Sequence, residues 1–149
     1  MEKLIIELGT AFIGSLGFAL MFHVRRVFWI PGALGGMLSW GIYLLGTSQT
    51  EGVFIPCLLA SAFAALYAEV LARILKAPAT IFFIPSVVPL IPGSTLYYTM
   101  SYAVQGAWDT SGTYGFLTVQ YALSIASGIS LVWAFSMMLS NKNFKNRLD

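Results

Sequence analysis

The chain has 149 residues, of which 58% are hydrophobic and only 9% are charged, and its mean hydropathy is +0.79. A soluble domain carries about 25% charged residues, because water must wet its surface. Four long segments contain no Asp, Glu, Lys or Arg: residues 27–50, 52–68, 77–108 and 110–141. Since a membrane-spanning helix needs roughly 20 mostly apolar residues, the composition predicts a polytopic integral membrane protein and excludes a soluble enzyme.

The rarer residue types exclude further classes of site. A single cysteine, Cys57, excludes an internal disulfide and a cysteine-based metal centre, and the one histidine, His23, leaves no cluster for a metal or a proton relay. The sequence has no Ser/His/Asp set, no paired carboxylates and no phosphate-binding loop, so we expect neither an enzyme nor a bound cofactor. The net charge of +2 does not indicate nucleic-acid binding, because membrane topology explains the basic residues better.

Five apolar stretches follow one another in chain order, with short polar connections between them. They predict membrane-spanning helices over Leu4–Phe22, Val27–Leu45, Val53–Leu75, Ala79–Val104 and Tyr114–Leu139. Neither a linker nor a low-complexity segment interrupts the series. The sequence therefore predicts a single all-α domain over residues 1–149, a bundle of about five transmembrane helices.

The basic residues predict how these helices are oriented. Alternate connections place seven of the eight on one side of the membrane: Arg25, Arg26, Arg73, Lys76, Lys142, Lys145 and Arg147. The other side has only Lys3, and its two loops carry the acids Glu51 and Asp109. Because cytoplasmic loops are enriched in Lys and Arg, we expect the N-terminus outside and the C-terminus in the cytoplasm.

Stripes of small residues occur on three of the predicted helices. Lipid supplies no hydrophobic force between helices, so small residues permit the close backbone approach that holds them together. We interpret these stripes as helix contact surfaces rather than ligand sites. They are Gly32 and Gly36; Ala60, Ala64 and Ala68; and Ser124, Ser127, Gly128 and Ser130.

The fourth stretch contains the most informative segment, with Pro85, Pro89 and Pro92 followed by Gly93. Proline has no N–H group and clashes with the preceding helical turn. Three prolines and a glycine therefore predict a broken helix. The midpoint of the stretch falls near Ile91, which places the expected break near the bilayer midplane, where irregular backbone must face protein or a watery cavity.

A helix that restarts after this break would present free N–H groups and the positive end of its dipole. Discontinuous helices of this kind hold anionic groups in secondary transporters. We expect Ser94 and Thr95 to cap the new helix and a carboxylate to be its natural ligand. The candidate substrate-binding residues are Pro89, Pro92, Gly93, Ser94, Thr95 and Tyr97. The alternative is a structural kink that only shapes the bundle.

Glu69 is the only acid deep in an apolar stretch, and intramembrane carboxylates are costly and commonly functional. Arg73 lies four residues further on, on the same helix face. Glu69 and Arg73 are therefore candidates for coupling or gating. A structural i,i+4 ion pair near the cytoplasmic interface explains them equally well, and the sequence leaves this choice open.

Several of these segments resemble the threonine/serine exporter family. The family's signature is similar to three runs of this chain: Ala77-Pro78-Ala79, then Phe83-Ile84-Pro85, then Val88 to Ser94. In this chain Ile91 replaces the more usual valine. The run Ala68 to Arg73 also looks like the family's pattern. Five spans and a late Gly/Ser-rich helix resemble the small stand-alone subunit of the two-component type, whose paired system is implicated in succinate export.

The resemblance implies a subunit that exports threonine, serine or dicarboxylates across the bacterial cytoplasmic membrane. It also implies a larger membrane subunit of the same family as partner, because this chain lacks the family's first half. The resemblance further implies proton motive force as the energy source, and the sequence contains no ATP-binding motif. A non-transporting scaffold that stabilises a partner membrane protein is the alternative function.

Overall fold

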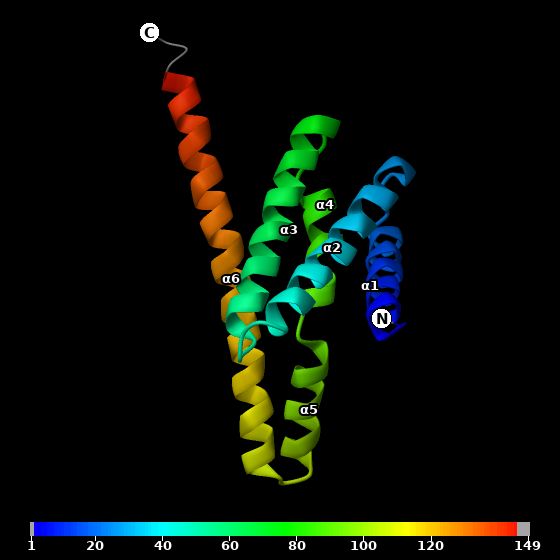
Figure 1. Cartoon of the computed structure of the whole chain (residues 1–149), viewed down its shortest axis with the longest axis vertical. Coiled ribbons are helices and arrows are strands. Elements are labelled where there is room, and N and C mark those ends of the chain that lie inside the picture. Colours follow the sequence, from blue (N-terminus) through cyan, green and yellow to red (C-terminus); the bar gives the residue numbers. More distant parts are fainter. Residues whose placement is uncertain (1, 146–149) are drawn as a thin grey trace.

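A computed structural model describes the backbone of residues 2–145 and the side chains of residues 2–138 (Figure 1). Within these residues the fold is entirely helical, which confirms the predicted fold class. The elements are α1 (Glu2–Met21), η1 (Arg26–Phe28), α2 (Trp29–Thr47), α3 (Phe54–Leu75), α4 (Thr80–Val87), η2 (Val88–Leu90), α5 (Gly93–Val104) and α6 (Trp108–Lys145).

Five helical segments correspond to the five predicted spans. Four helices, α1, α2, α3 and α6, are long and apolar enough to cross a membrane, and the bent pair of α4–η2 with α5 is the fifth candidate span. The main difference is at α6, which begins at Trp108 rather than Tyr114. Asp109 lies in its first turn, where the positive end of the helix dipole favours an acid, so residues predicted as a polar loop are helical.

The helices α1 to α4 form a bundle, with α2 in contact with α1, α3 and α4. The first part of helix α6 packs on α5, and a later part packs on α3. Helix α6 has 38 residues and is therefore about 57 Å long at 1.5 Å per residue, well beyond the roughly 30 Å of hydrocarbon in a bilayer. Figure 1 shows the result: α5 and the first part of α6 form a helical hairpin beyond the ends of α1, α2 and α3.

Close backbone contacts hold the bundle together at the predicted small residues of α2. A Cβ atom added at Gly36 would overlap Ser15 of α1 and lie 2.9 Å from the carbonyl oxygen of Pro85 in α4. A Cβ at Gly35 would overlap Ser86. Only glycine lets three helices approach each other this closely.

The contact between α3 and α6 is made in the same way. A Cβ at Gly128 of α6 would overlap Ser61 and lie 2.6 Å from the Leu58 carbonyl oxygen of α3. The alanines of the α3 stripe, Ala60, Ala64 and Ala68, are buried. The glycine and alanine stripes are thus helix contact surfaces, as the sequence predicts.

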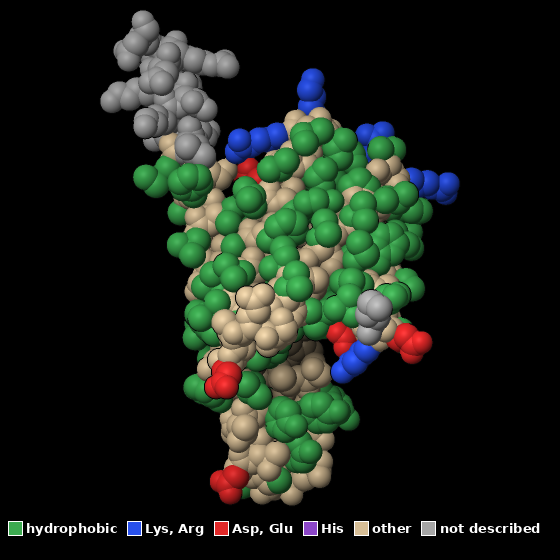
Figure 2. Space-filling model, in the orientation of Figure 1, with side chains coloured by type: hydrophobic (Ala, Val, Ile, Leu, Met, Phe, Trp, Pro, Cys, Tyr) green, Lys and Arg blue, Asp and Glu red, His purple; other side chains and the backbone are tan. Residues whose placement is uncertain are grey.

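Charged side chains gather at the two ends of the bundle (Figure 2). The α1–α2 turn carries Arg25 and Arg26, and the end of α3 carries Arg73 and Lys76; these turns point the same way (Figure 1). The N-terminus, the α2–α3 loop and the α5–α6 turn lie toward the opposite end. The alternation of sides that underlies the charge argument is therefore present in the fold.

Candidate functional site

The fourth predicted span is broken, and the break lies at Ile91 and Pro92. Helix α4 runs through Pro85 without interruption and passes into the 3-10 turn η2 at Val88. Ile91 is extended, with φ −64° and ψ 126°, and α5 begins at Gly93. The two halves are bent by 50°. The prediction of a broken helix is confirmed, but Pro85 does not contribute to the break, because a single proline is tolerated within a helix whose other bonds persist.

Carbonyl groups next to the break accept hydrogen bonds from donors outside the regular α-helical pattern. The Val88 carbonyl accepts the Ile91 N–H at 3.1 Å, in place of the N–H that Pro92 lacks. The Ser39 hydroxyl of α2 donates to the Ser86 carbonyl at 2.6 Å. These bonds to buried carbonyls stabilise the interrupted backbone within the bundle, as an apolar environment requires.

The break lies near one end of the bundle. Leu90 is only 3% exposed and packs in the same cluster as Tyr43, which lies in the last turns of α2. Figure 1 shows the break level with the ends of α2 and α3 rather than with their centres. The place of the break near the bilayer midplane stays a prediction, and α5 continues beyond the bundle (Figure 1).

The expected side-chain cap on α5 is absent from the described residues. Pro92 occupies the N-cap position, and no side chain accepts a capping bond there. The Thr95 hydroxyl instead donates back to the Pro92 carbonyl at 3.1 Å and accepts a bond from the Thr118 hydroxyl of α6 at 3.0 Å. Because the helix begins at Gly93, Ser94 and Thr95 lie in its first turn, whose N–H groups have no acceptor within the helix.

A cavity of about 130 Å³ opens beside the break. Four of the predicted substrate-binding residues line it: Pro89, Pro92, Ser94 and Thr95. Gly93 is in the break but not in the lining. Tyr97 is 67% exposed and packs edge-on against Tyr98, so it points away from this cavity.

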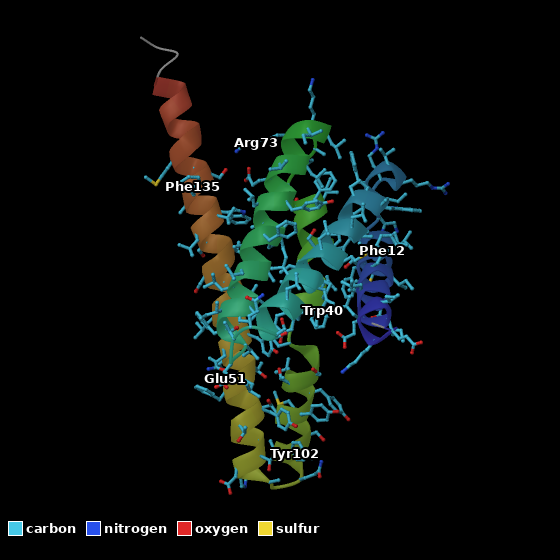
Figure 3. All side chains as sticks on the ribbon, in the orientation of Figure 1. Phe12, Trp40, Glu51, Arg73, Tyr102 and Phe135 are labelled. Atoms are coloured by element: carbon cyan, nitrogen blue, oxygen red, sulfur yellow. The ribbon has the colours of Figure 1, made fainter. Side chains whose placement is uncertain are left out.

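Three aromatic residues from other helices complete the wall, and none of them is among the residues predicted from the sequence: Trp40 and Tyr43 of α2, and Tyr121 of α6. Tyr43 and Tyr121 share a hydrogen bond of 2.6 Å between their hydroxyls, and Trp40 stacks on Tyr43 with ring centroids 5.0 Å apart. Figure 3 shows Trp40 in the middle of the molecule, near the break. Two tyrosines inside uncharged segments were the available signal, but only the fold shows that they meet.

A second cavity, of about 250 Å³, adjoins the first, because Trp40 and Pro89 line both. Its other walls come from α1 and include Glu7 and Thr10. Glu7 also lies 3.9 Å from the Lys3 ammonium group. The two cavities place a carboxylate and a hydroxyl group close to the break, on the side of the bundle where the N-terminus lies.

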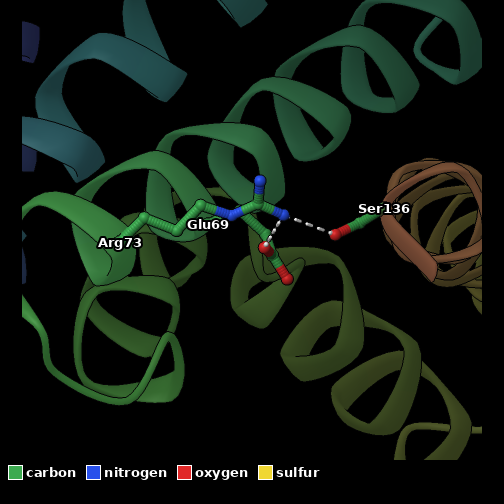
Figure 4. Close-up of polar contacts among 3 residues, drawn as sticks. All are labelled: Glu69, Arg73 and Ser136. Atoms are coloured by element: carbon green, nitrogen blue, oxygen red, sulfur yellow. Dashed lines mark hydrogen bonds and ion pairs between the residues drawn. The ribbon is translucent and has the colours of Figure 1, made fainter. Parts of the chain in front are cut away.

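Glu69 and Arg73 lie in a different place, on the last turns of α3 (Figure 4). The Arg73 Nη2 donates to the Glu69 carboxylate at 3.2 Å and to the Ser136 hydroxyl of α6 at 3.1 Å. These residues line a third cavity, of about 470 Å³, between α3 and α6. The structure therefore brings the residues of the break together but separates them from the Glu69–Arg73 pair. Among residues 2–145, no group of three His, Cys, Asp or Glu side chains could hold a metal ion.

One known protein family matches nearly the whole chain. The family model described as "Threonine/Serine exporter, ThrE" matches residues 7–135. This range includes the broken helix, every residue that lines its cavity, and the Glu69–Arg73 pair. Searches of curated proteins and of solved structures found no match.

Proposed function

Because the chain belongs to the threonine/serine exporter family, it is a multi-pass membrane exporter and not an enzyme, and we propose that it binds its substrate at the break between α4 and α5. The proposed substrates are small carboxylates or amino acids: threonine, serine or succinate. All of these carry a carboxylate group, which is the group that the break is suited to hold.

The cavity beside the break is the observation that carries this proposal. The N–H groups of Ser94 and Thr95 lie in the first turn of α5 and have no acceptor within the helix. They lie at the positive end of the helix dipole, which favours an anion. The Ser94 and Tyr43 side chains also line the cavity and bring hydroxyl groups to it. A bound carboxylate would accept charge-assisted hydrogen bonds from such donors.

We further propose that a second, larger membrane subunit completes the site. The cavity of about 130 Å³ is smaller than the roughly 300–1,000 Å³ that enclose most small ligands. None of the residues of α5 is buried against the rest of the described chain. Large apolar side chains on α5, including Leu96, Met100 and Val104, are exposed instead. These features support a partner that covers α5 and encloses the substrate from the other side.

The proposed exporter lies in the bacterial cytoplasmic membrane with its N-terminus outside and its C-terminus in the cytoplasm. The positive-inside rule and the clustering of Arg25, Arg26, Arg73 and Lys76 at one end of the bundle support this orientation. The break then lies toward the outer side of the membrane.

Cysteine labelling tests the orientation. In a Cys57→Ser background, a single cysteine at Ser48 should react with a membrane-impermeant thiol reagent added to intact cells, because Ser48 is exposed at the proposed outer end; Ser111, at the same end, is only 7% exposed and should react slowly. A cysteine at Asn143 should stay unlabelled until the cells are opened. External labelling at Asn143 would contradict the orientation.

Two roles are open for the Glu69–Arg73 pair. The pair either takes part in proton coupling or gating, or it is a structural ion pair. Under coupling, Glu69→Gln abolishes gradient-driven efflux in a protein that is still folded and inserted, because the amide cannot carry a proton. Under the structural alternative, the double variant Glu69→Gln with Arg73→Gln exports normally. Retained efflux by Glu69→Gln alone would exclude coupling.

Transport itself is tested with proteoliposomes that contain the chain with or without a candidate larger subunit. Efflux of labelled serine, threonine and succinate is measured for both preparations. We expect efflux of at least one substrate only when both proteins are present. The alternative function, a scaffold without a substrate site, is supported if the chain raises the amount of folded partner while variants at the break leave the efflux rate unchanged.

A further inference from the structure

A groove lies between α3 and α6 at the basic end of the bundle, and it is separate from the break. Its volume is about 470 Å³, within the usual range for a site that holds a small molecule. Above the Gly128 contact the two helices diverge (Figure 1).

The lining of the groove changes from polar to apolar along its length. Arg73, Glu69 and Ser136 lie toward the basic end, where α3 stops at Leu75. Deeper in the groove the walls are apolar, with Leu66 of α3 and Leu131 of α6. Arg73 and Leu66 are seven residues apart, which is about 10 Å along a helix. A polar group at the membrane surface followed by an apolar wall is also the layout of a phospholipid.

Arg73 has donors left for a negatively charged ligand. Its side chain is 65% exposed, and a single nitrogen, Nη2, makes both bonds to Glu69 and Ser136. In Figure 4 the other terminal nitrogen points away from these two partners. A guanidinium group presents five N–H donors in a planar fork that matches a phosphate group. Glu69 and Ser136 therefore hold the guanidinium in position at the groove while part of its fork remains free.

We propose that this groove binds one anionic phospholipid, with its phosphate on Arg73 and an acyl chain along Leu66, Val70, Leu131 and Phe135. Basic pockets between transmembrane helices on the cytoplasmic side bind anionic headgroups, and Arg73 and Lys76 mark this end as basic. The headgroup of an anionic lipid such as phosphatidylglycerol adds only its phosphate charge, which the free donors of Arg73 can bind, so we expect the site to favour such a lipid. The apolar walls make the acyl chain as necessary as the phosphate.

Native mass spectrometry of the purified full chain tests this proposal, with phosphatidylglycerol and phosphatidylcholine supplied in detergent micelles. We expect one phosphatidylglycerol to be retained per chain, at about tenfold lower lipid concentration than phosphatidylcholine. Arg73→Gln should remove this preference, while Lys76→Gln, three residues away and outside the lining, should keep it. Leu131→Trp fills the groove and should abolish retention of both lipids, whereas Leu123→Trp, equally on α6 but outside the groove, should not.

Two results would overturn the proposal. One is equal retention of the two lipids by the parental chain, since Arg73 then selects no headgroup. The other is displacement of phosphatidylglycerol by inorganic phosphate at millimolar concentration, because the acyl chain then contributes nothing. A photo-crosslinking residue in place of Phe135 adds an independent measurement: capture of lipid supports the site, and capture of a second protein chain contradicts it. None of these readouts depends on export, so they stand apart from the proposed function.

Discussion

The bundle of α1 to α4 and the hairpin of α5 with the first part of α6 are built on different principles, although one broken helix joins them. In the bundle, glycine and alanine bring helix backbones into direct contact, and buried serines bridge them, as Ser39 does to Ser86. In the hairpin, rings and hydroxyls make the contacts: Tyr102 stacks on Tyr114 with centroids 5.6 Å apart, and Ser111 donates to the Thr99 carbonyl at 2.8 Å.

The two regions also differ in how many of their residues are buried within the described chain. The bundle buries its own contact surfaces, whereas α5 has no residue buried against the described chain. In Figure 3, Tyr102 lies at the far end of the hairpin, well away from Trp40 and the break. A well-packed scaffold therefore carries an element whose apolar surface is still uncovered, and the proposed substrate site lies at the junction of the two.

The largest expected effect comes from joining the two regions into one helix. Replacing Pro92 and Gly93 together by alanine restores an N–H group and a residue with strong helix propensity at the break. The helix should close and use the donors of Ser94 and Thr95 in internal bonds, so we expect loss of export with normal insertion. Efflux from proteoliposomes that contain the partner measures this. Export at the parental rate, at equal protein levels, would lead us to abandon the site.

A smaller effect should distinguish the packing of the two regions. Gly36→Ala places a methyl group against Ser15 and the Pro85 carbonyl, and we expect it to destabilise the bundle by about 2 kcal/mol. Gly112→Ala is the matched control in the hairpin, where an added Cβ meets nothing within 4 Å; there, alanine should be neutral or stabilising by up to roughly 1 kcal/mol. Thermal unfolding in detergent measures both. Equal melting temperatures for the two variants would contradict the packing argument.

The smallest expected effect is at the junction itself. Ser94→Ala removes one hydroxyl from the cavity lining without changing the backbone, so we expect apparent substrate affinity to fall by about tenfold, as for one lost hydrogen bond to a charged group. Ser130→Ala, an exposed serine of α6 outside the cavities described above, is the control. The concentration dependence of efflux measures the change. The same loss in both variants would assign it to general destabilisation rather than to the site.

Much of the fold was predictable because the membrane imposes strong local rules. Lengths of uncharged sequence predict the spans, and the prolines predict the broken fourth helix, since neither inference depends on distant contacts. The cap on α5 was predicted wrongly for a local reason: Ser94 and Thr95 have capping side chains, but the N-cap position is Pro92, two residues before Ser94. Which position becomes the N-cap depends on the backbone of Ile91 and Pro92, and residue types alone do not determine that backbone.

The sequence by itself determined the membrane class, the positions of the apolar helices and the existence of a break, because each follows from residues that are neighbours in the chain. Only the tertiary structure decided that the break lies near the ends of α2 and α3, and that Trp40, Tyr43 and Tyr121 line its cavity. It also decided that Arg73 reaches Ser136 across the groove between α3 and α6. These features join residues that are far apart in sequence. Glycine and serine set where the helices approach closely and at what angle they cross, and this crossing brings the residues together.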